Sequence, residues 1–397
     1  MNKFVLGIMY WIKYKLVITL RLLLMNRMTL LLLSCILSLI VSELSYRLVV
    51  DGSIDKNSLY SVSTTGNQYN FYQFDPLLGW SNKPDVWGIY KRDEFAYKVS
   101  INSYGMRQKS ISKIKKKGIY RIAILGDSFV WGIGVDNDHR VTESLERILP
   151  RTEVLNFGVS GYSPIQYLLM IDSVIAFQPN LIIMIFCLGN DYEDNVYFER
   201  YGHYKPYAIL ENNELRIEGY PLPNVKKYVV GTRKSIYGSR FLADLQNAIV
   251  KLFIKQKGLI GFNNELIFKD SNHLTKTEIE LKMKAISINE ILISKIYKIL
   301  KNNSIGFIVA DAPTKREYYD PLNNENRVFR SIEIELEKTC NRIGVQFIPN
   351  ISSLDGHDFW EKDQHWNYEG NRKIAFNIKS YLLNTEYYKM MINKKKK

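Results

Sequence analysis

Five short apolar runs, separated by stretches of helical character, most constrain the fold of this 397-residue chain. Each run is apolar on consecutive residues rather than on alternate ones, which is typical of parallel strands covered by helices on both faces. Helical stretches lie between them at residues 142–149, 164–177 and 328–343. We therefore predict a three-layer α/β/α sandwich with a mostly parallel, flavodoxin-like five-stranded sheet. The predicted strands are residues 120–126, 154–159, 181–189, 305–310 and 345–348.

Residues 28–50 form an apolar segment about long enough to span a hydrocarbon core of roughly 30 Å. Lysines and arginines crowd before this segment and are sparse just after it. That asymmetry predicts a single-pass transmembrane helix with a cytoplasmic N-terminus and an extracytoplasmic remainder. A cleaved signal peptide, or a lipoprotein signal ending at Cys35, is the alternative. No small-residue cleavage site follows the apolar stretch, so we favour the anchor.

The rest of the chain divides by composition and pattern. Residues 1–27 form a basic cytoplasmic segment, and residues 51–118 form a polar tether followed by a small β-rich extension with turns between aromatic stretches. Residues 119–390 carry the strand–helix alternation. An insertion at about 192–275 separates the third and fourth strands, where a long insertion can cap a site. Residues 391–397 are a basic tail.

The net charge of +14 suggests a nucleic-acid partner at first sight, but much of the excess lies at the two ends of the chain. Charge placed there fits membrane topology and a solvated tail better than a binding face, so we predict no nucleic-acid partner. The five histidines show no pairing at metal-ligand spacing, and we predict neither a metal nor another cofactor.

Short polar segments follow the first three predicted strands, and a fourth lies near the C-terminus. Because the carboxyl ends of parallel strands share one edge of a sheet, these segments are expected to meet there. A serine on a sharp turn, with a histidine and an aspartate, can form a hydrolytic site. Taken singly, each segment is also compatible with a helix cap or a turn. The four segments are Gly126-Asp127-Ser128-Phe129, residues 156–163 with Gly161, Leu188-Gly189-Asn190-Asp191, and Asp363-Gln364-His365-Trp366-Asn367.

In this order the four segments resemble those of the SGNH hydrolases, the GDSL-type serine esterases and acyltransferases, over about residues 119–385. Residues 75–80 and 101–105 also look like an extension seen in membrane-anchored members. The resemblance implies that Ser128 is the nucleophile, His365 the base and Asp363 the acid that orients it. It also implies an oxyanion hole made by the Ser128 N–H, Gly161 and the Asn190 side chain.

One feature departs from the family pattern. The usual spacing is Asp-x-x-His, whereas Asp363 and His365 are separated by one residue. A similar Asp-x-His spacing occurs in SGNH-type proteins that acetylate exported polysaccharides. Asp355 and Asp358 therefore stay open as alternative partners of the imidazole.

We expect an extracytoplasmic serine esterase or O-acyltransferase that acts on acyl esters of a carbohydrate, with acetyl as the expected acyl group. One alternative is a non-catalytic SGNH-like module that binds glycan or serves as a scaffold, which the joint retention of Ser128, Asn190 and His365 disfavours. Another is a lipid esterase, which the lack of a long apolar lid in the insertion disfavours. No residue decides between water and a sugar hydroxyl as the acyl acceptor.

Overall fold

The computed structural model describes residues 71–222 (except 202 and 213), 275–315 and 330–383, with isolated positions between Trp11 and Ser45. The isolated positions belong to a unit of residues 1–59 and 232–252 and are helical; within it, Lys15 Nζ lies 4.5 Å from the centre of the Trp11 ring. Among the described residues, none of the helices has the length and apolar character needed to cross a membrane. Most of the predicted span at 28–50 lies outside the described residues.

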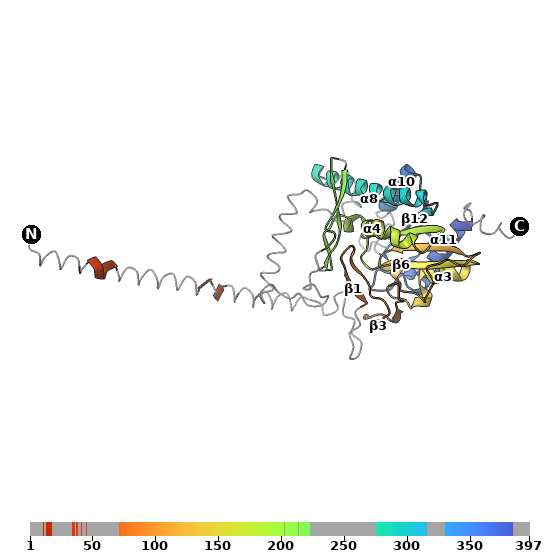
Figure 1. Ribbon diagram of the computed structural model, residues 1–397, viewed down its shortest axis with the longest axis horizontal. Coiled ribbons are helices and arrows are strands. Elements are labelled where there is room, and N and C mark those ends of the chain that lie inside the picture. Colours follow the sequence, from red (N-terminus) through yellow and green to blue (C-terminus); the bar gives the residue numbers. More distant parts are fainter. Residues whose placement is uncertain are drawn as a thin grey trace, which may run out of the picture. The chain divides into compact units, whose positions relative to one another are not determined.

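A parallel five-stranded sheet lies at the centre of the second unit, which comprises residues 60–231 and 253–397 (Figure 1). Its strands are ordered β13-β12-β7-β5-β6, and every neighbouring pair is parallel. Read from the β6 edge in chain order, this is the flavodoxin-like arrangement 2-1-3-4-5. The predicted α/β class and parallel sheet are confirmed. The strands are β5 (Tyr120–Gly126), β6 (Thr152–Gly158), β7 (Leu181–Cys187), β12 (Gly306–Ala312) and β13 (Gln346–Ile348).

Alternate side chains of the strands pack against helices on opposite faces of the sheet, which gives the three layers. Ala123 and Leu125 of β5 share one core with α4, α8 and α10. Ile122 and Ile124 share the other core with α2, α3 and α11. Because both faces exclude water, the strands read as continuous apolar runs. The helices are α2 (Ser128–Trp131), α3 (Val141–Ile148), α4 (Pro164–Ile175), α8 (Lys276–Asn302), α10 (Arg330–Ile343) and α11 (Tyr368–Leu383).

Residues 71–101 contain two antiparallel hairpins that cover part of the α/β domain. One joins β1 (Tyr72–Asp75) to β2 (Gly79–Asn82), and the other joins β3 (Trp87–Lys91) to β4 (Ala96–Ser100). Aromatic side chains of these hairpins form a third core around Trp131, the last residue of α2, which is fully buried. The hairpins therefore pack on the helix that begins with Ser128.

Two further hairpins lie in the predicted insertion after a single-turn helix, α5 (Asp191–Asp194). Residues 223–274 of the insertion lie outside the described residues. Three 3₁₀ turns, η1, η3 and η4, complete the described elements. The hairpins are β8 (Glu199–Arg200) with β9 (His203–Tyr204) and β10 (Tyr207–Glu211) with β11 (Glu214–Glu218); the turns are Asn137–His139, Ile351–Ser353 and Gly356–Asp358.

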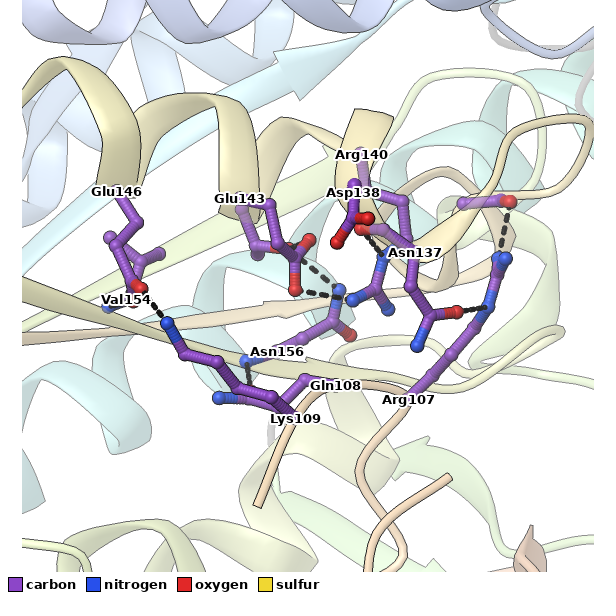
Figure 2. Close-up of polar contacts among 12 residues, drawn as sticks. Arg107, Gln108, Lys109, Asn137, Asp138, Arg140, Glu143, Glu146, Val154 and Asn156 are labelled. Atoms are coloured by element: carbon purple, nitrogen blue, oxygen red, sulfur yellow. Dashed lines mark hydrogen bonds and ion pairs between the residues drawn. The ribbon is translucent and has the colours of Figure 1, made fainter. Parts of the chain in front are cut away.

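A buried polar network holds the segment that follows α2 (Figure 2). The guanidinium of Arg107, fully buried, donates to the carbonyl oxygens of Trp131 (2.8 Å) and Val135 (2.6 Å), and its Nε donates to Asn137 Oδ1 (3.0 Å). Burial and the nearby Arg140 lower the pKa of Arg107 to about 9. Burying a cation is costly, and the carbonyl acceptors offset that cost. Arg107 thereby anchors the last residue of α2, the helix that Ser128 begins, and the segment that follows it.

Candidate active site

The serine of the first segment stands at the carboxyl edge of the sheet. Ser128 begins α2 directly after β5, and the Asp127 carboxylate caps the helix by accepting from the Phe129 N–H at 2.9 Å. Gly126 makes the turn possible, because a Cβ there would lie 2.2 Å from Cγ2 of Val130. The local sequence thus places the serine at the end of the strand, where the residue is 8% exposed.

The histidine of the fourth segment meets this serine, although the two residues are far apart in the sequence. His365 Nε2 lies 2.7 Å from Ser128 Oγ, and His365 Nδ1 lies 2.5 Å from Asp363 Oδ1. An ionised carboxylate can only accept hydrogen bonds, so Nδ1 carries the proton and Nε2 presents its lone pair to the hydroxyl. Ser128, His365 and Asp363 therefore form one continuous line of hydrogen bonds.

Aromatic packing fixes the plane of the imidazole. The Phe129 ring lies 4.6 Å from the His365 ring, measured between centroids. Next to the histidine, Trp366 is 1% exposed, and its indole N–H donates to the carbonyl oxygen of Pro313 at 3.0 Å. A β-bridge between Phe359 and Trp366 closes the loop. The histidine therefore sits on a loop anchored to the core on both sides.

Asp355 and Asp358, the alternative partners of the imidazole, pair with a lysine instead. The carboxylates of Asp355 and Asp358 each accept from Lys373 Nζ, at 2.6 Å and 2.8 Å. The Asp358 carboxylate also accepts from the backbone N–H of Asp355, which closes the η4 turn. The carboxylate that contacts the His365 ring in the structure is that of Asp363, and the short Asp-x-His spacing does not prevent this contact.

Gly161 follows β6 and Asn190 follows β7, and their N–H groups are in different states. Within the described residues, neither the Gly161 N–H nor the Ser128 N–H donates a hydrogen bond. Gly161 has φ +78°, and a Cβ there would lie 2.5 Å from a ring carbon of Tyr201. The Asn190 amide instead donates to Asp194 Oδ2 at 2.7 Å and to Asp191 Oδ1 at 3.2 Å. Its N–H groups are thus engaged by carboxylates.

Of the carboxyl groups of Asp127, Asp191 and Asp363, only that of Asp363 has a lowered pKa. Burial alone would raise the pKa of this carboxyl, but His365 and Arg92 bring it far below its usual range. Burial raises the pKa of Asp127, and burial together with Asp127 and Asp194 raises that of Asp191. Asp363 is therefore the carboxylate best suited to stay ionised beside an imidazolium. Within the described ranges, no cluster of three His, Cys, Asp or Glu side chains could hold a metal ion.

Two side chains near the site were missed by the sequence reasoning. Arg92 forms an ion pair with Asp363, and Glu94 accepts backbone N–H groups of the histidine loop. Both lie in the turn between β3 and β4. The sequence there reads Arg92-Asp93-Glu94, which is typical of any exposed hairpin turn and carries no signal of a partner so distant in the chain.

Among known proteins, this chain is similar to a set of solved structures. No protein-family model matches the chain, and no curated protein matches it. Solved structures that share 11–14% sequence identity align with about two thirds of the chain. One is the psychrotrophic esterase EstA from a Pseudoalteromonas species, at 11% identity and a TM-score of 0.36, aligned over 66% of this chain and 99% of that one.

Two other structures have similar values. A member of the lipolytic G-D-S-L family from Veillonella parvula shares 14% identity at a TM-score of 0.33, over 67% of this chain and 100% of that one. The acetyl xylan esterase AlAXEase shares 12% identity at a TM-score of 0.35, over 66% of this chain and 98% of that one. The similar structures named here are thus esterases and a lipolytic protein.

Proposed function

We propose that this chain is an SGNH-type serine esterase or O-acyltransferase that acts on acyl esters, chiefly acetyl esters, of a carbohydrate. The observation that carries the proposal is the alignment of Ser128 Oγ, the His365 ring and the Asp363 carboxylate, with contacts of 2.7 Å and 2.5 Å. This is the arrangement that activates a serine hydroxyl, because the base is within hydrogen-bond reach and is itself oriented.

Acylation follows from these contacts. Ser128 Oγ attacks the ester carbonyl, and His365 Nε2 takes its proton. Asp363 holds the other ring proton and stabilises the imidazolium that forms. The tetrahedral intermediate then collapses: the C–O bond to the alcohol breaks, and His365 returns the proton to the departing alkoxide. An acyl group remains on Ser128.

Deacylation repeats the same steps with a different nucleophile. His365 Nε2 takes a proton from water or from a sugar hydroxyl, and the resulting oxygen nucleophile attacks the acyl-serine. The Ser128 oxygen leaves and recovers the proton from His365. Water gives a free acid and sugar gives a new ester, so the acceptor alone decides between hydrolase and transferase.

Three donors are proposed to stabilise the oxyanion of both tetrahedral intermediates: the Ser128 N–H, the Gly161 N–H and the Asn190 amide. The Ser128 and Gly161 N–H groups make no competing hydrogen bond within the described residues. The Asn190 amide would have to release one of its two carboxylate partners to join them. Each such donor is worth on the order of a hundredfold or more in kcat.

The proposed carbohydrate substrate has two sources of support. The Asp363-x-His365 spacing resembles that of SGNH-type proteins that acetylate exported polysaccharides, and the chain is 13% aromatic, a content suited to stacking on sugar rings. A non-catalytic binding module would have no need for a base aligned on a serine, so the 2.7 Å contact disfavours that alternative.

The reaction is tested with the full chain and a series of 4-nitrophenyl esters, with and without an acetylated oligosaccharide and a free oligosaccharide acceptor. We expect turnover of the acetyl ester and slower turnover of long-chain esters. Transfer of acetyl to the free oligosaccharide identifies a transferase, and release of acetate alone identifies a hydrolase. Preference for long-chain esters would favour a lipid esterase, and no turnover of any ester would favour a binding module.

We also propose that the chain is anchored by residues 28–50 with residues 51–397 outside the cytoplasm, on the basis of the charge asymmetry around that segment. A reporter fused after Lys397 tests this. We expect alkaline phosphatase, which needs an oxidising compartment, to be active in the fusion, and a reporter that works only in the cytoplasm to be silent. The reverse pattern would contradict the proposed topology.

A further inference from the structure

The turn between β3 and β4 reaches the carboxylate that orients the histidine. Arg92, at the start of this turn, donates through Nη1 to Asp363 Oδ2 in an ion pair. The other oxygen, Oδ1, accepts from His365 Nδ1 and from the His365 backbone N–H, at 2.5 Å and 2.9 Å. Arg92 and His365 thus divide the two oxygens of Asp363 between them. The Arg92 side chain is 24% exposed and that of Asp363 11%, so solvent screens this pair less than a surface pair.

The same turn also holds the backbone of the histidine loop. Glu94 accepts from the backbone N–H groups of Lys362 (2.7 Å) and Asp363 (3.0 Å). Next to it, the Phe95 ring packs on the Trp360 ring, with 5.1 Å between centroids. One short turn therefore fixes the carboxylate of Asp363 and the backbone on its N-terminal side.

The β3–β4 hairpin also contacts the helix that carries Ser128. Arg92 Nε donates to the Tyr90 hydroxyl at 3.0 Å, and the Tyr90 ring packs edge-on against Trp131 with 6.1 Å between centroids. Trp131 ends the helix α2 that Ser128 begins. The β3–β4 hairpin therefore connects the two segments that bring Ser128 and His365 together.

We propose that Arg92 is a positioning residue for the reaction: it fixes the Asp363 carboxylate, and through it the tautomer and plane of His365, while Glu94 anchors the loop. This inference rests on the proposed function. It also assigns a role in the active site to the β-rich extension, which carries neither the serine nor the histidine.

The physical reason lies in the short Asp-x-His spacing. With one residue between them, Asp363 accepts from both the ring and the backbone of His365 through the same oxygen, Oδ1. The histidine alone therefore leaves the carboxylate some freedom to turn about its bond to Cβ. A guanidinium on Oδ2 removes that freedom and keeps the carboxylate ionised, in accord with the lowered pKa of Asp363. A surface ion pair would have neither effect.

The test is a double-mutant cycle on kcat and KM for 4-nitrophenyl acetate with the full chain. Arg92→Ala is expected to lower kcat roughly 10- to 100-fold with little change in KM, because a misplaced base impairs the chemical step. Arg92→Lys keeps the charge and is expected to recover part of the loss. In the Asp363→Asn background, Arg92→Ala is expected to lower kcat no further, since Arg92 acts through the carboxylate.

A matched control and a spectroscopic readout separate positioning from folding. Arg216→Ala removes an exposed arginine that pairs with Glu211 and is expected to leave kcat unchanged. The low-field proton resonance of His365 Nδ1–H is expected in the wild type and should broaden or move in Arg92→Ala. If Arg92→Ala does not fold, judged by its thermal unfolding midpoint, the cycle is run with Arg92→Gln.

Two results would overturn the inference. Unchanged kcat in Arg92→Ala, together with a crippled Asp363→Asn, means that the carboxylate needs no second partner. An equal loss from Arg92→Ala in the wild-type and Asp363→Asn backgrounds means that Arg92 only supports the fold. In either case Ser128→Ala remains inactive and the proposed function stands, whereas an active Ser128→Ala variant removes the proposed function itself.

Discussion

Ser128→Ala is expected to lower kcat for an acetyl ester by roughly 10³-fold or more while the fold survives. The alanine removes the only atom that attacks the carbonyl and leaves the backbone donors of the proposed oxyanion hole in place. The residue is nearly buried and its Oγ contacts His365 Nε2 at 2.7 Å, so the change leaves a space of about one oxygen atom and one unpaired ring nitrogen. The measurement is kcat with 4-nitrophenyl acetate, alongside the thermal unfolding midpoint.

Ser144→Ala is the matched control for this variant. Ser144 is 6% exposed, close to the 8% of Ser128, and its Oγ accepts from Arg147 at 3.1 Å on the helix α3, away from the proposed chemistry. We expect it to keep wild-type kcat. A Ser128→Ala variant that cleaves the ester at nearly the wild-type rate would show that another group is the nucleophile.

The sheet was predictable from sequence because burial leaves a simple signature there. Strand β7 has all seven residues buried, and its apolar run Leu181–Cys187 could not be a half-exposed strand. The predicted strand 120–126 has the bounds of β5, and the other predicted strands differ by up to a few residues at their ends. Those ends shift because a polar residue such as Thr152 or Asp311 can continue the ladder when its side chain finds a place in the interior.

The contact between the serine and the histidine was also foreseeable, for a topological reason. Parallel strands with right-handed crossovers place every carboxyl end on one edge, so Ser128 after β5 and the loop before α11 converge there whatever their separation in the sequence. The identity of the aspartate was not foreseeable in the same way. Asp355, Asp358 and Asp363 lie within one loop region, and Lys373, one turn into α11, engages two of them.

The contribution of the extension lies beyond what sequence patterns can indicate. The contact between Arg92 and Asp363 joins two loops 271 positions apart, and neither loop has a periodicity that reveals its partner. The hydrogen bonds from the Asn190 amide to Asp191 and Asp194 could not be predicted from the sequence either, because the rotation of the side chain decides which acceptor the amide meets. Polar contacts between loops depend on tertiary geometry. The burial of strands and helices, in contrast, is visible in the periodicity of apolar residues along the sequence.

Asp363→Asn is expected to lower kcat by roughly 10³- to 10⁴-fold, the loss expected when the orienting carboxylate of a triad becomes an amide. The contacts of Asp363 explain why no orientation of the amide restores function. With its oxygen toward His365, the amide N–H groups face the guanidinium of Arg92, which can only donate. With its N–H groups toward His365, they meet the backbone N–H and hold the proton on Nε2, which then cannot accept from Ser128.

The comparison that decides this prediction uses the neighbouring aspartates. Asp355→Asn removes a charge from the same loop, but its carboxylate pairs with Lys373 and its side chain is 49% exposed, so we expect nearly wild-type kcat. Asp358→Asn breaks a pair in which the aspartate side chain is 1% exposed and is expected to lower the unfolding midpoint more than kcat. If Asp355→Asn or Asp358→Asn loses most of its kcat while Asp363→Asn stays nearly intact, Asp363 is not the carboxylate that orients His365. The Ser128–His365–Asp363 line would then describe a resting arrangement that the reaction does not use.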